Sequence, residues 1–307
     1  MLQKLTRMFK KSTKWSKVLI CLGLLLLGLV ILNKNSPRRE GFRQRKKYIL
    51  KTNEDIFDEF YVPVYNQLMD NKIKNIFEVK EIARTTKFDP HSVLLDIGSG
   101  LGHHVHLFNK IGGDKCIGLD KSEAMVNAAK YKYNNLDFKR GNVMDFMNFE
   151  KESFTHITCL YFTVYYIKDK TRFFKNCYDW LMPSGYLALH LVNRDKFDPI
   201  LEAANPLHIV SPQKYAKKRI TNSIVKFNNF DYKSNFKLDK NNIAFFDEYF
   251  KDRNSKKVRH NQHQLYMETQ KHILSLARQA GFILKGKIDM IGCQYEYQYI
   301  YILSKPS

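Results

Sequence analysis

Asp96 ends an apolar run, and glycines follow it at positions 98, 100 and 102. Glycine has no Cβ atom, so its backbone can turn tightly and approach a ligand closely. A segment of helical character comes directly after the last glycine. A strand, a glycine turn and a helix N-terminus together form the cofactor-binding turn of open α/β sheets. The stretch 93–102 therefore indicates ligand binding more than stability.

A second carboxylate stands 20 residues beyond Gly100, where Asp120 ends the short apolar run 115–120. In dinucleotide-binding folds, a carboxylate roughly 20 residues past the glycine turn accepts hydrogen bonds from ribose hydroxyls. Ser122 is a favourable N-cap for the next helix, and Met125 lies on the apolar face of that helix. Asp120 is accordingly predicted to hold a ribose.

The glycine pattern, D-x-G-x-G-x-G, resembles motif I of the class I S-adenosylmethionine-dependent methyltransferases. A dinucleotide fingerprint would read G-x-G-x-x-G, which leaves a Rossmann dehydrogenase as a distant alternative. Downstream, residues 138–145 resemble the family motif that reaches the adenine amino group. Asn142 stands where the family usually has Asp, and its carbonyl can still accept a hydrogen bond. Val143 matches the small residue that packs on the adenine ring.

A further match lies upstream, in residues 60–68. This stretch resembles the F-A-x-x-Y-D-x-L helix of small-molecule methyltransferases, which folds over the bound cofactor. Tyr65 falls on the motif's tyrosine, and Tyr61 lies one turn earlier on the same face. The alternative, an amphipathic helix whose tyrosines only pack, stays open.

The resemblance covers roughly residues 55–305 and implies an α/β fold. Its core would be a Rossmann-like, seven-stranded, doubly wound sheet whose last strand is antiparallel. Residues 154–162 and 186–192 are predicted to be the fourth and fifth strands. Two apolar runs, 283–291 and 295–303, are predicted to be the terminal hairpin.

S-adenosyl-L-methionine is the cofactor that the resemblance implies. The same resemblance implies the cofactor-binding residues, which are Tyr65, Asp96, Gly98, Ser99, Gly100, Gly102, His103, Asp120, Lys121, Met125, Asn142, Val143, Cys159 and Leu160.

The predicted acceptor site lies at the carboxyl ends of the strands, where open α/β sheets bind ligands. Tyr161, Tyr166, Asn193 and Arg194 are the candidate substrate contacts after strands four and five. Methyl transfer depends mainly on alignment, and a base is needed only when the acceptor loses a proton. Tyr161, Tyr165 and His190 are the candidate catalytic residues, with no choice made among them, although a histidine that alternates within a strand, as His190 does, is more often a core histidine.

About 75 residues separate strand five from the last helix, which Thr269 is predicted to cap and Gly281 to close. This is longer than an ordinary connection. The stretch 224–238 alternates in places between apolar and polar residues, which favours a strand. Residues 195–268 are therefore predicted to form a β-rich insertion over the substrate side. The alternative is an accessory sheet that stabilises an edge.

The formal net charge is +21, and more than half of this excess lies in residues 1–50. Residues 18–32 are uncharged and mostly apolar, which is short of the ~17–25 residues of a spanning helix. No small-residue cleavage site follows, so an uncleaved membrane anchor over 18–33 is predicted. The expected order is a basic tail (1–17), the anchor, a basic linker (34–50) and a methyltransferase domain (51–307).

The basic residues on the two sides of the anchor are nearly balanced, so they do not set its orientation. The catalytic domain is expected in the cytosol, where the cofactor is made. The linker would then contact anionic headgroups, with a solvated linker as the alternative. No cysteine spacing indicates a disulfide framework or zinc site, and His103, His104 and His106 lack ligand partners at metal-binding spacing, so no metal is expected.

The predicted protein is a membrane-anchored, single-pass methyltransferase with a small-molecule or lipid-like acceptor. A nucleic-acid partner is disfavoured, because the residues after strand four are Cys159-Leu-Tyr-Phe and not an Asp/Asn-Pro-Pro-aromatic motif. Protein or RNA ribose targets remain alternatives. A catalytically silent, membrane-tethered scaffold is a third reading, and the intact acidic and glycine residues of the two motifs argue against it.

Overall fold

The computed structural model describes residues 13–23, 42, 44, 46–200, 213 and 216–307. The chain divides into two compact units, residues 1–40 and 41–307. In the first unit, residues 14–23 are helical and expose apolar side chains, among them Trp15, Leu19 and Leu22. Among the described residues, no helix has both the length and the apolar character needed to cross a membrane. Residues 24–33 of the predicted anchor lie outside the described residues.

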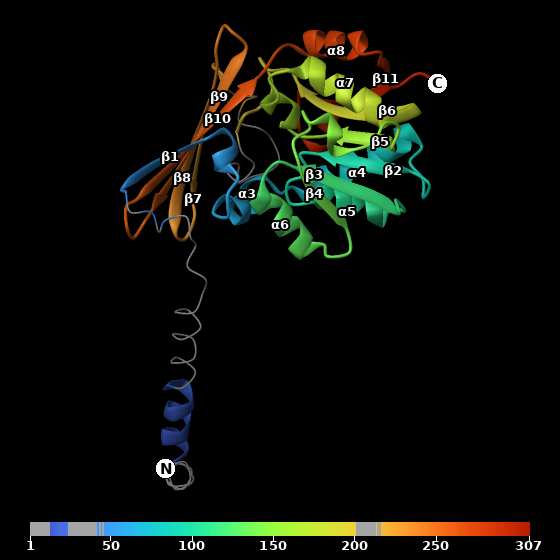
Figure 1. Ribbon diagram of the computed structural model, residues 1–307. Helices are drawn as coiled ribbons and strands as arrows, with labels where there is room; N and C mark the ends of the chain where they lie inside the picture. Colours follow the sequence, from blue (N-terminus) through green and yellow to red (C-terminus); the bar gives the residue numbers. More distant parts are fainter. Residues whose placement is uncertain (1–12, 24–41, 43, 45, 201–212, 214–215) are drawn as a thin grey trace. The chain divides into compact units, whose positions relative to one another are not determined.

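The larger unit contains a seven-stranded sheet, as predicted (Figure 1). Its strands are, in spatial order, β11 (Ile283–Asp289), β12 (Gln298–Ser304), β6 (Leu181–Val192), β5 (Phe154–Cys159), β2 (Val93–Ile97), β3 (Lys115–Asp120) and β4 (Asp137–Arg140). Strand β12 runs antiparallel to β6 and β11, and the remaining pairs are parallel. Parallel strands bring their carboxyl ends to one edge, so the segments after β2, β3, β5 and β6 meet there.

Helices cover both faces of this sheet (Figure 1). The helices α4 (Lys72–Thr86), α5 (His103–Lys110) and α6 (Glu123–Lys132) enclose one apolar core, and α7 (Lys170–Trp180) and α8 (Gln270–Gln279) enclose the other. The predicted caps are confirmed. Ser122 Oγ accepts from the Met125 N–H at 3.1 Å, and Thr269 Oγ1 accepts from the His272 N–H at 3.2 Å.

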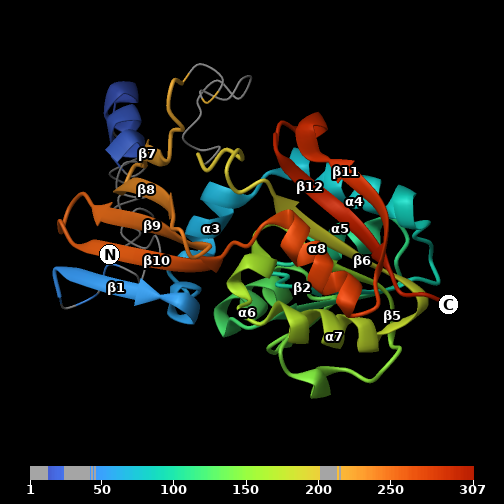
Figure 2. The ribbon, with the colours of Figure 1, turned by 90° about the horizontal axis from the view of Figure 1, so that it is seen from above.

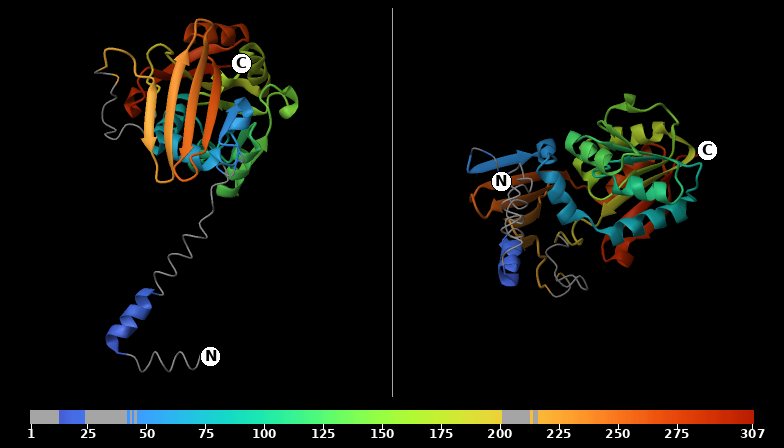
Figure 3. Two further views of the ribbon diagram at one scale, coloured as in Figure 1. Left: turned by 90° about the vertical axis from the view of Figure 1, so that its left-hand side faces the viewer. Right: turned by 90° about the horizontal axis from the view of Figure 1, so that it is seen from below.

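The predicted insertion supplies four strands of a second, five-stranded sheet, which faces the viewer in the left panel of Figure 3. Its order is β1 (Tyr48–Thr52), β10 (Val258–Tyr266), β9 (Ile243–Asp252), β8 (Phe230–Leu238) and β7 (Asn222–Lys226). The alternation in β8 is confirmed, because Phe230, Tyr232, Ser234 and Phe236 are buried on one face. The predicted boundary between the basic linker (34–50) and the methyltransferase domain (51–307) is wrong. Strand β1 already pairs in parallel with β10 from Tyr48 onward.

Helix α3 (Tyr61–Met69) lies between the second sheet and the α/β part (Figure 2). Its buried side chains Tyr61, Val64 and Leu68 join an apolar cluster with Phe250 of β9 and Met125 of α6. The predicted cofactor-covering helix therefore holds the two sheets together. Short 3-10 turns complete the unit at Asn53–Ile56 (η2), Phe146–Asn148 (η3), Thr163–Tyr166 (η4) and Met290–Cys293 (η7).

Candidate active site

A cavity of about 1100 Å³ opens at the carboxyl ends of β2, β3 and β5. Its walls come from the glycine turn, from helices α3 and α4, from η4 and from β9 and β10 of the second sheet. The two sheets thus enclose one site, with the predicted cofactor motifs on one side and the insertion on the other. A volume of this size is at the upper end of the range for small-molecule sites.

The glycine turn leaves space for a ligand at one position. Gly98, Gly100 and Gly102 all have positive φ angles, a region that other residues rarely adopt. A Cβ on Gly102 would lie 2.5 Å from the ring of Phe138, and one on Gly98 would lie 2.4 Å from Thr163. A Cβ on Gly100 would meet no atom within 4 Å. Gly98 and Gly102 therefore serve close packing, while Gly100 borders the open cavity.

Asp120 lies at the end of β3 and is tied to the same turn. Its Oδ2 accepts from the Gly100 N–H at 2.8 Å, and its Oδ1 accepts from the Ser122 N–H at 2.8 Å. Burial raises the pKa of Asp120 above its ordinary value, while these backbone donors act in the opposite direction. The residue also lines the cavity, and a carboxylate has about four lone-pair sites. The carboxylate can therefore still accept a hydrogen bond from a ligand hydroxyl.

Asp96 is buried beneath the glycine turn and also lines the cavity. Thr158 Oγ1 donates to its Oδ1 at 2.7 Å. Burial raises the pKa of Asp96 to about 6, even though the charge of His104 and the bond from Thr158 lower it. The neighbouring Ser99 Oγ is buried without a hydrogen-bond partner. A buried carboxylate and an unpaired hydroxyl at one turn are suited to a polar ligand group.

The segment after β4 supplies the predicted adenine contacts. Asn142 and Val143 both line the cavity. The side-chain oxygen of Asn142, Oδ1, accepts a hydrogen bond from the Met144 N–H at 3.1 Å. This bond holds the side chain in place and leaves one lone pair on Oδ1. Leu160 and Met125 contribute buried apolar surface to the same wall.

Most predicted cofactor residues line the cavity: Tyr65, Asp96, Gly98, Ser99, Gly100, His103, Asp120, Lys121, Met125, Asn142, Val143 and Leu160. Gly102 and Cys159 do not belong to the lining. Gly102 packs against Phe138, and Cys159 is buried within β5. Their placement corrects the expectation of direct contact, and Gly102 acts on the turn through packing.

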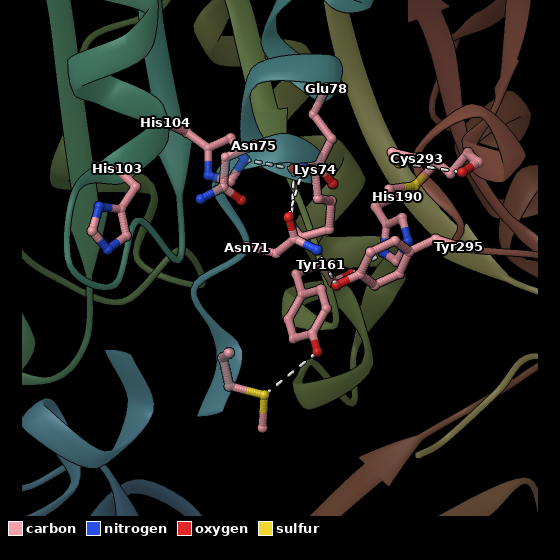
Figure 4. Close-up of polar contacts among 12 residues, drawn as sticks. Asn71, Lys74, Asn75, Glu78, His103, His104, Tyr161, His190, Cys293 and Tyr295 are labelled. Atoms are coloured by element: carbon pink, nitrogen blue, oxygen red, sulfur yellow. Dashed lines mark hydrogen bonds and ion pairs between the residues drawn. The ribbon is translucent and has the colours of Figure 1, made fainter. Parts of the chain in front are cut away.

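Tyr161 follows β5 and lines the cavity, in agreement with its predicted position. Its φ of 52° lies in the left-handed region, which is strained for a bulky side chain. The hydroxyl donates to Met69 Sδ at 3.5 Å, and Lys74 Nζ lies 5.0 Å from the ring centre (Figure 4). Strained backbone is found often at ligand sites, which supports a functional position for Tyr161.

Lys74 belongs to a buried polar cluster that the sequence did not reveal (Figure 4). Its Nζ donates to Glu78 Oε2 at 3.0 Å, and His104 Nε2 donates to the same oxygen at 2.7 Å. Burial acts to raise the pKa of Glu78, but the charge of Lys74 and the bond from His104 lower it to about 2. Lys74 and His104 both line the cavity, so the cluster places polar nitrogen groups in its wall.

Two predicted catalytic residues lie outside the cavity lining. Tyr165 is fully buried, and its hydroxyl accepts from the Val192 N–H at 2.8 Å. His190 is also fully buried. Its Nδ1 is hydrogen-bonded to the Tyr161 carbonyl, and its Nε2 lies 3.1 Å from Gln298 Oε1. Both side chains hold β6 against its neighbours, which corrects their candidacy as bases. The reading of His190 as a core histidine matches its placement.

The two polar residues after β6 are likewise absent from the lining. Asn193 Oδ1 accepts from the Asp195 N–H at 3.2 Å and so caps its own turn. Arg194 donates to Asn242 Oδ1 and to the Met267 carbonyl, which ties the end of β6 to the second sheet. These contacts correct their prediction as substrate residues, because Asn193 Oδ1 and the Arg194 guanidinium bond within the protein and neither residue lines the cavity.

A second buried network centres on β9 and β10 of the insertion, and sequence reasoning named only its tyrosines Tyr61 and Tyr166. Glu248 of β9 is completely buried, and His263 of β10 bonds to it through Nε2 at 2.7 Å. His263 Nδ1 lies 2.8 Å from the hydroxyl of Tyr166. Tyr166 and His263 line the cavity. The available signal was the period-two placement of Arg259, Asn261 and His263, which puts polar residues on the inner face of a strand.

Comparison with known proteins agrees with this geometry. Residues 95–189 match the protein family described as a methyltransferase domain. The phosphoethanolamine N-methyltransferase of Plasmodium falciparum is 28% identical over 174 residues, which are 52% of this chain and 58% of that protein. The demethylmenaquinone methyltransferase of Chlorobaculum parvum is 30% identical over 137 residues, which are 43% and 56% of the two chains. The chain thus spans just over half the length of these relatives.

The solved structure of S-adenosylmethionine-bound CalS10 from Micromonospora echinaspora, an amino pentose methyltransferase, shares the fold. It matches with a TM-score of 0.56 and 17% identity, over 80% of this chain and 96% of that one. Residues 95–189 are therefore similar to a methyltransferase domain, and the chain shares the fold of a solved methyltransferase structure.

Proposed function

We propose that the protein transfers a methyl group from S-adenosylmethionine to a small-molecule acceptor. The observation that carries this proposal is the open position at Gly100 beside the Asp120 carboxylate, at the carboxyl ends of β2 and β3. The residues of the cavity fit the cofactor in type. Asp120 would accept the ribose hydroxyls, Asn142 and Val143 would contact the adenine, and the turn around Asp96 and Ser99 would hold the methionyl part.

The bound cofactor would supply an activated methyl group on a sulfonium, so the protein's task is largely to align the acceptor. The cavity wall opposite the glycine turn would do this, since it brings together aromatic side chains from α3, η4 and the second sheet. Residues after β5 and from the insertion would therefore choose the acceptor.

Calorimetric titration of the full chain in detergent micelles tests the cofactor assignment. We expect S-adenosylmethionine and S-adenosylhomocysteine to bind and NADH not to bind. The Asp120→Ala variant should lose at least about tenfold in affinity, or 1.4 kcal/mol, because the ribose contact is removed. Asp114→Ala, a change just before β3 and outside the cavity lining, is the control. A folded wild-type chain that binds neither adenosyl ligand would favour the silent scaffold.

The acceptor is tested with methyl-labelled cofactor and three probes: phosphoethanolamine, a demethylmenaquinol and an amino pentose. These compounds represent the acceptors in the names of the similar proteins. Transfer to one of them would support a small-molecule acceptor. Labelling of protein or RNA in place of the probes would favour the alternative macromolecular target.

We further propose that residues 18–33 anchor the protein in a membrane, with the catalytic domain on the cytosolic side and its acceptor at the membrane surface. The uncharged stretch 18–32, its basic flanks and the exposed apolar side chains of residues 14–23 support this proposal. We expect the full chain to float with vesicles. The Leu25→Glu/Leu26→Glu variant should not, because two charges in the apolar span oppose insertion. Equal flotation of the two chains would reject the anchor.

A further inference from the structure

A tyrosine, a histidine and a glutamate lie in series at the inner face of the second sheet, and the histidine and the glutamate belong to the sheet itself. Tyr166 lies on η4, His263 on β10 and Glu248 on β9, so three separate elements converge. The hydroxyl of Tyr166 lies 2.8 Å from His263 Nδ1, and His263 Nε2 lies 2.7 Å from Glu248 Oε2. The series runs from the cavity to a fully buried carboxylate.

Glu248 is held as an anion by its surroundings. Tyr61 and Tyr232 donate their hydroxyls to its two oxygens at 2.7 Å and 2.8 Å. Burial acts to raise the pKa of Glu248, but the hydrogen bond and charge of His263 and the two tyrosine hydroxyls bring it below its ordinary value. An ionised acceptor at Nε2 fixes the proton of His263 on that nitrogen. Nδ1 is then left as an acceptor for the Tyr166 hydroxyl.

Tyr166 is the member of this series that a ligand can reach. It keeps 36% of its surface accessible, whereas His263 keeps 2% and Glu248 none. Desolvation raises the pKa of Tyr166 well above its usual value, with the charge of Glu248 as the next cause. Tyr166 therefore keeps its own proton at rest, and it can accept a proton only while it passes one to His263.

We propose that Tyr166, His263 and Glu248 form a proton relay that removes the proton of the methyl acceptor. The inference rests on the proposed methyltransferase function and assigns the acceptor class: a hydroxyl or an ammonium group. Tyr166 is the catalytic residue, because its hydroxyl would contact the acceptor. His263 and Glu248 are positioning residues that act through Tyr166: His263 orients the phenol and takes up its proton, and Glu248 stabilises the imidazolium that forms.

The step is balanced as follows. The acceptor proton passes to the Tyr166 oxygen, and the Tyr166 proton passes to His263 Nδ1, so the relay gains one positive charge beside Glu248. The lone pair of the deprotonated acceptor forms the new bond to the methyl carbon. The electron pair of the broken methyl–sulfur bond stays on sulfur, and S-adenosylhomocysteine results.

The opposite face of the same sheet offers a matched control. Tyr48, His260 and Asp247 repeat the arrangement, with 2.6 Å from the Tyr48 hydroxyl to His260 Nδ1 and 2.7 Å from His260 Nε2 to Asp247 Oδ1. None of these three residues lines the cavity. The chemistry of the two series is alike, and only one of them faces a ligand site.

The first test measures methyl transfer by Tyr166→Phe and His263→Gln to whichever of the three probes the wild type methylates. Each variant should lose about 100-fold or more in kcat, the usual contribution of a general base, with S-adenosylhomocysteine affinity unchanged. The double variant should lose no more than either single variant, because the residues act as one unit. Tyr48→Phe and His260→Gln should keep the wild-type rate.

The second test does not depend on turnover. The ¹⁵N NMR spectrum of the histidine-labelled full chain should show His263 with its proton on Nε2 and a hydrogen-bonded Nδ1. Tyr166→Phe should shift the Nδ1 signal of His263 and leave His260 unchanged. Tyr48→Phe should do the reverse.

The outcomes separate the relay from the cofactor assignment. A His263 that carries its proton on Nδ1, or a Tyr166→Phe variant with wild-type kcat, would overturn the relay. A wild-type chain that binds S-adenosylhomocysteine but methylates none of the three probes would also reject it, while the cofactor assignment stands. A folded wild-type chain that does not bind S-adenosylhomocysteine would instead reject the proposed function.

Discussion

The three glycines of the turn at residues 98–102 do not all have the same structural role, although they form one motif in the sequence. Gly102 cannot carry a Cβ because Phe138 and Ala129 occupy that space. Gly100 has open space at the same place and donates its N–H to Asp120. A glycine of this motif can therefore serve the packing of the protein or leave room for a ligand. The two cases predict different effects when alanine replaces the glycine.

Gly100→Ala should fold and lose cofactor binding. The new methyl group meets no protein atom, so the cost to stability is about the 1–2 kcal/mol of a left-handed alanine. The methyl group occupies ligand space, so S-adenosylhomocysteine affinity should fall at least about tenfold. Thermal melts and calorimetry measure the two effects separately.

Gly102→Ala is the comparison. It should lower the melting temperature more than Gly100→Ala does, because its Cβ would overlap a buried ring. The opposite order of melting temperatures would contradict the assignment of Gly102 to close packing and of Gly100 to ligand space.

At the scale of elements, α4 contributes a buried ion pair where an amphipathic helix would ordinarily bury apolar residues. Lys74 and Glu78 lie one turn apart, and His104 reaches Glu78 from α5. The pair couples two helices beside the cavity. Removing one partner from a buried ion pair leaves a charge without compensation, which is costly.

Glu78→Gln should destabilise the protein by about 3–5 kcal/mol at neutral pH, because Lys74 stays buried. The pKa of Glu78 is lowered from 4.5 to about 2, so its ionised form stabilises the folded state above about pH 4.5. That contribution is lost as the pH falls toward 2. Urea unfolding at several pH values should therefore show the gap between wild type and variant narrowing in acid.

Glu81→Gln is the control on the same helix. Glu81 pairs with the exposed Arg84 at 2.7 Å, and water screens such a surface pair, so its loss should change the stability little. A Glu78→Gln variant as stable as Glu81→Gln would show that the buried pair contributes little.

At the scale of the whole larger unit, the site depends on two sheets that are far apart along the chain. Strand β1 comes from residues 48–52 and closes the β10 edge of a sheet whose other strands lie beyond residue 221. Arg259 of β10 donates to Asp58 Oδ2 and to the Ile56 carbonyl, and so ties the second sheet to the segment before α3. The wall of the cavity therefore needs the N-terminal segment.

Deletion of residues 1–52 should lower the melting temperature by about 4 °C or more relative to deletion of residues 1–40. The longer deletion removes β1 and exposes the hydrogen-bonding edge of β10, while the shorter one ends at the boundary of the compact unit. Melting and light scattering of the two proteins measure stability and association. Equal melting and equal scattering would show that β1 is dispensable.

The sequence by itself determined the seven-stranded sheet, the helix caps and most of the cofactor side of the cavity. These features depend on local patterns: apolar runs, glycines at fixed spacing and carboxylates at strand ends. The topology of parallel strands then brings those residues to one edge, so Asp96, Gly100, Asp120 and Asn142 could be predicted without coordinates.

Only the tertiary structure decided the acceptor side. His263 and Glu248 are separated from Tyr166 by 97 and 82 positions in the chain, and no local pattern records that they meet. Tyr165 and His190 were candidate catalytic residues and Tyr166 only a candidate substrate contact, but β6 and its neighbours bury Tyr165 and His190. Residue type and spacing define what a side chain can do, whereas burial and long-range pairing decide whether a ligand can reach it.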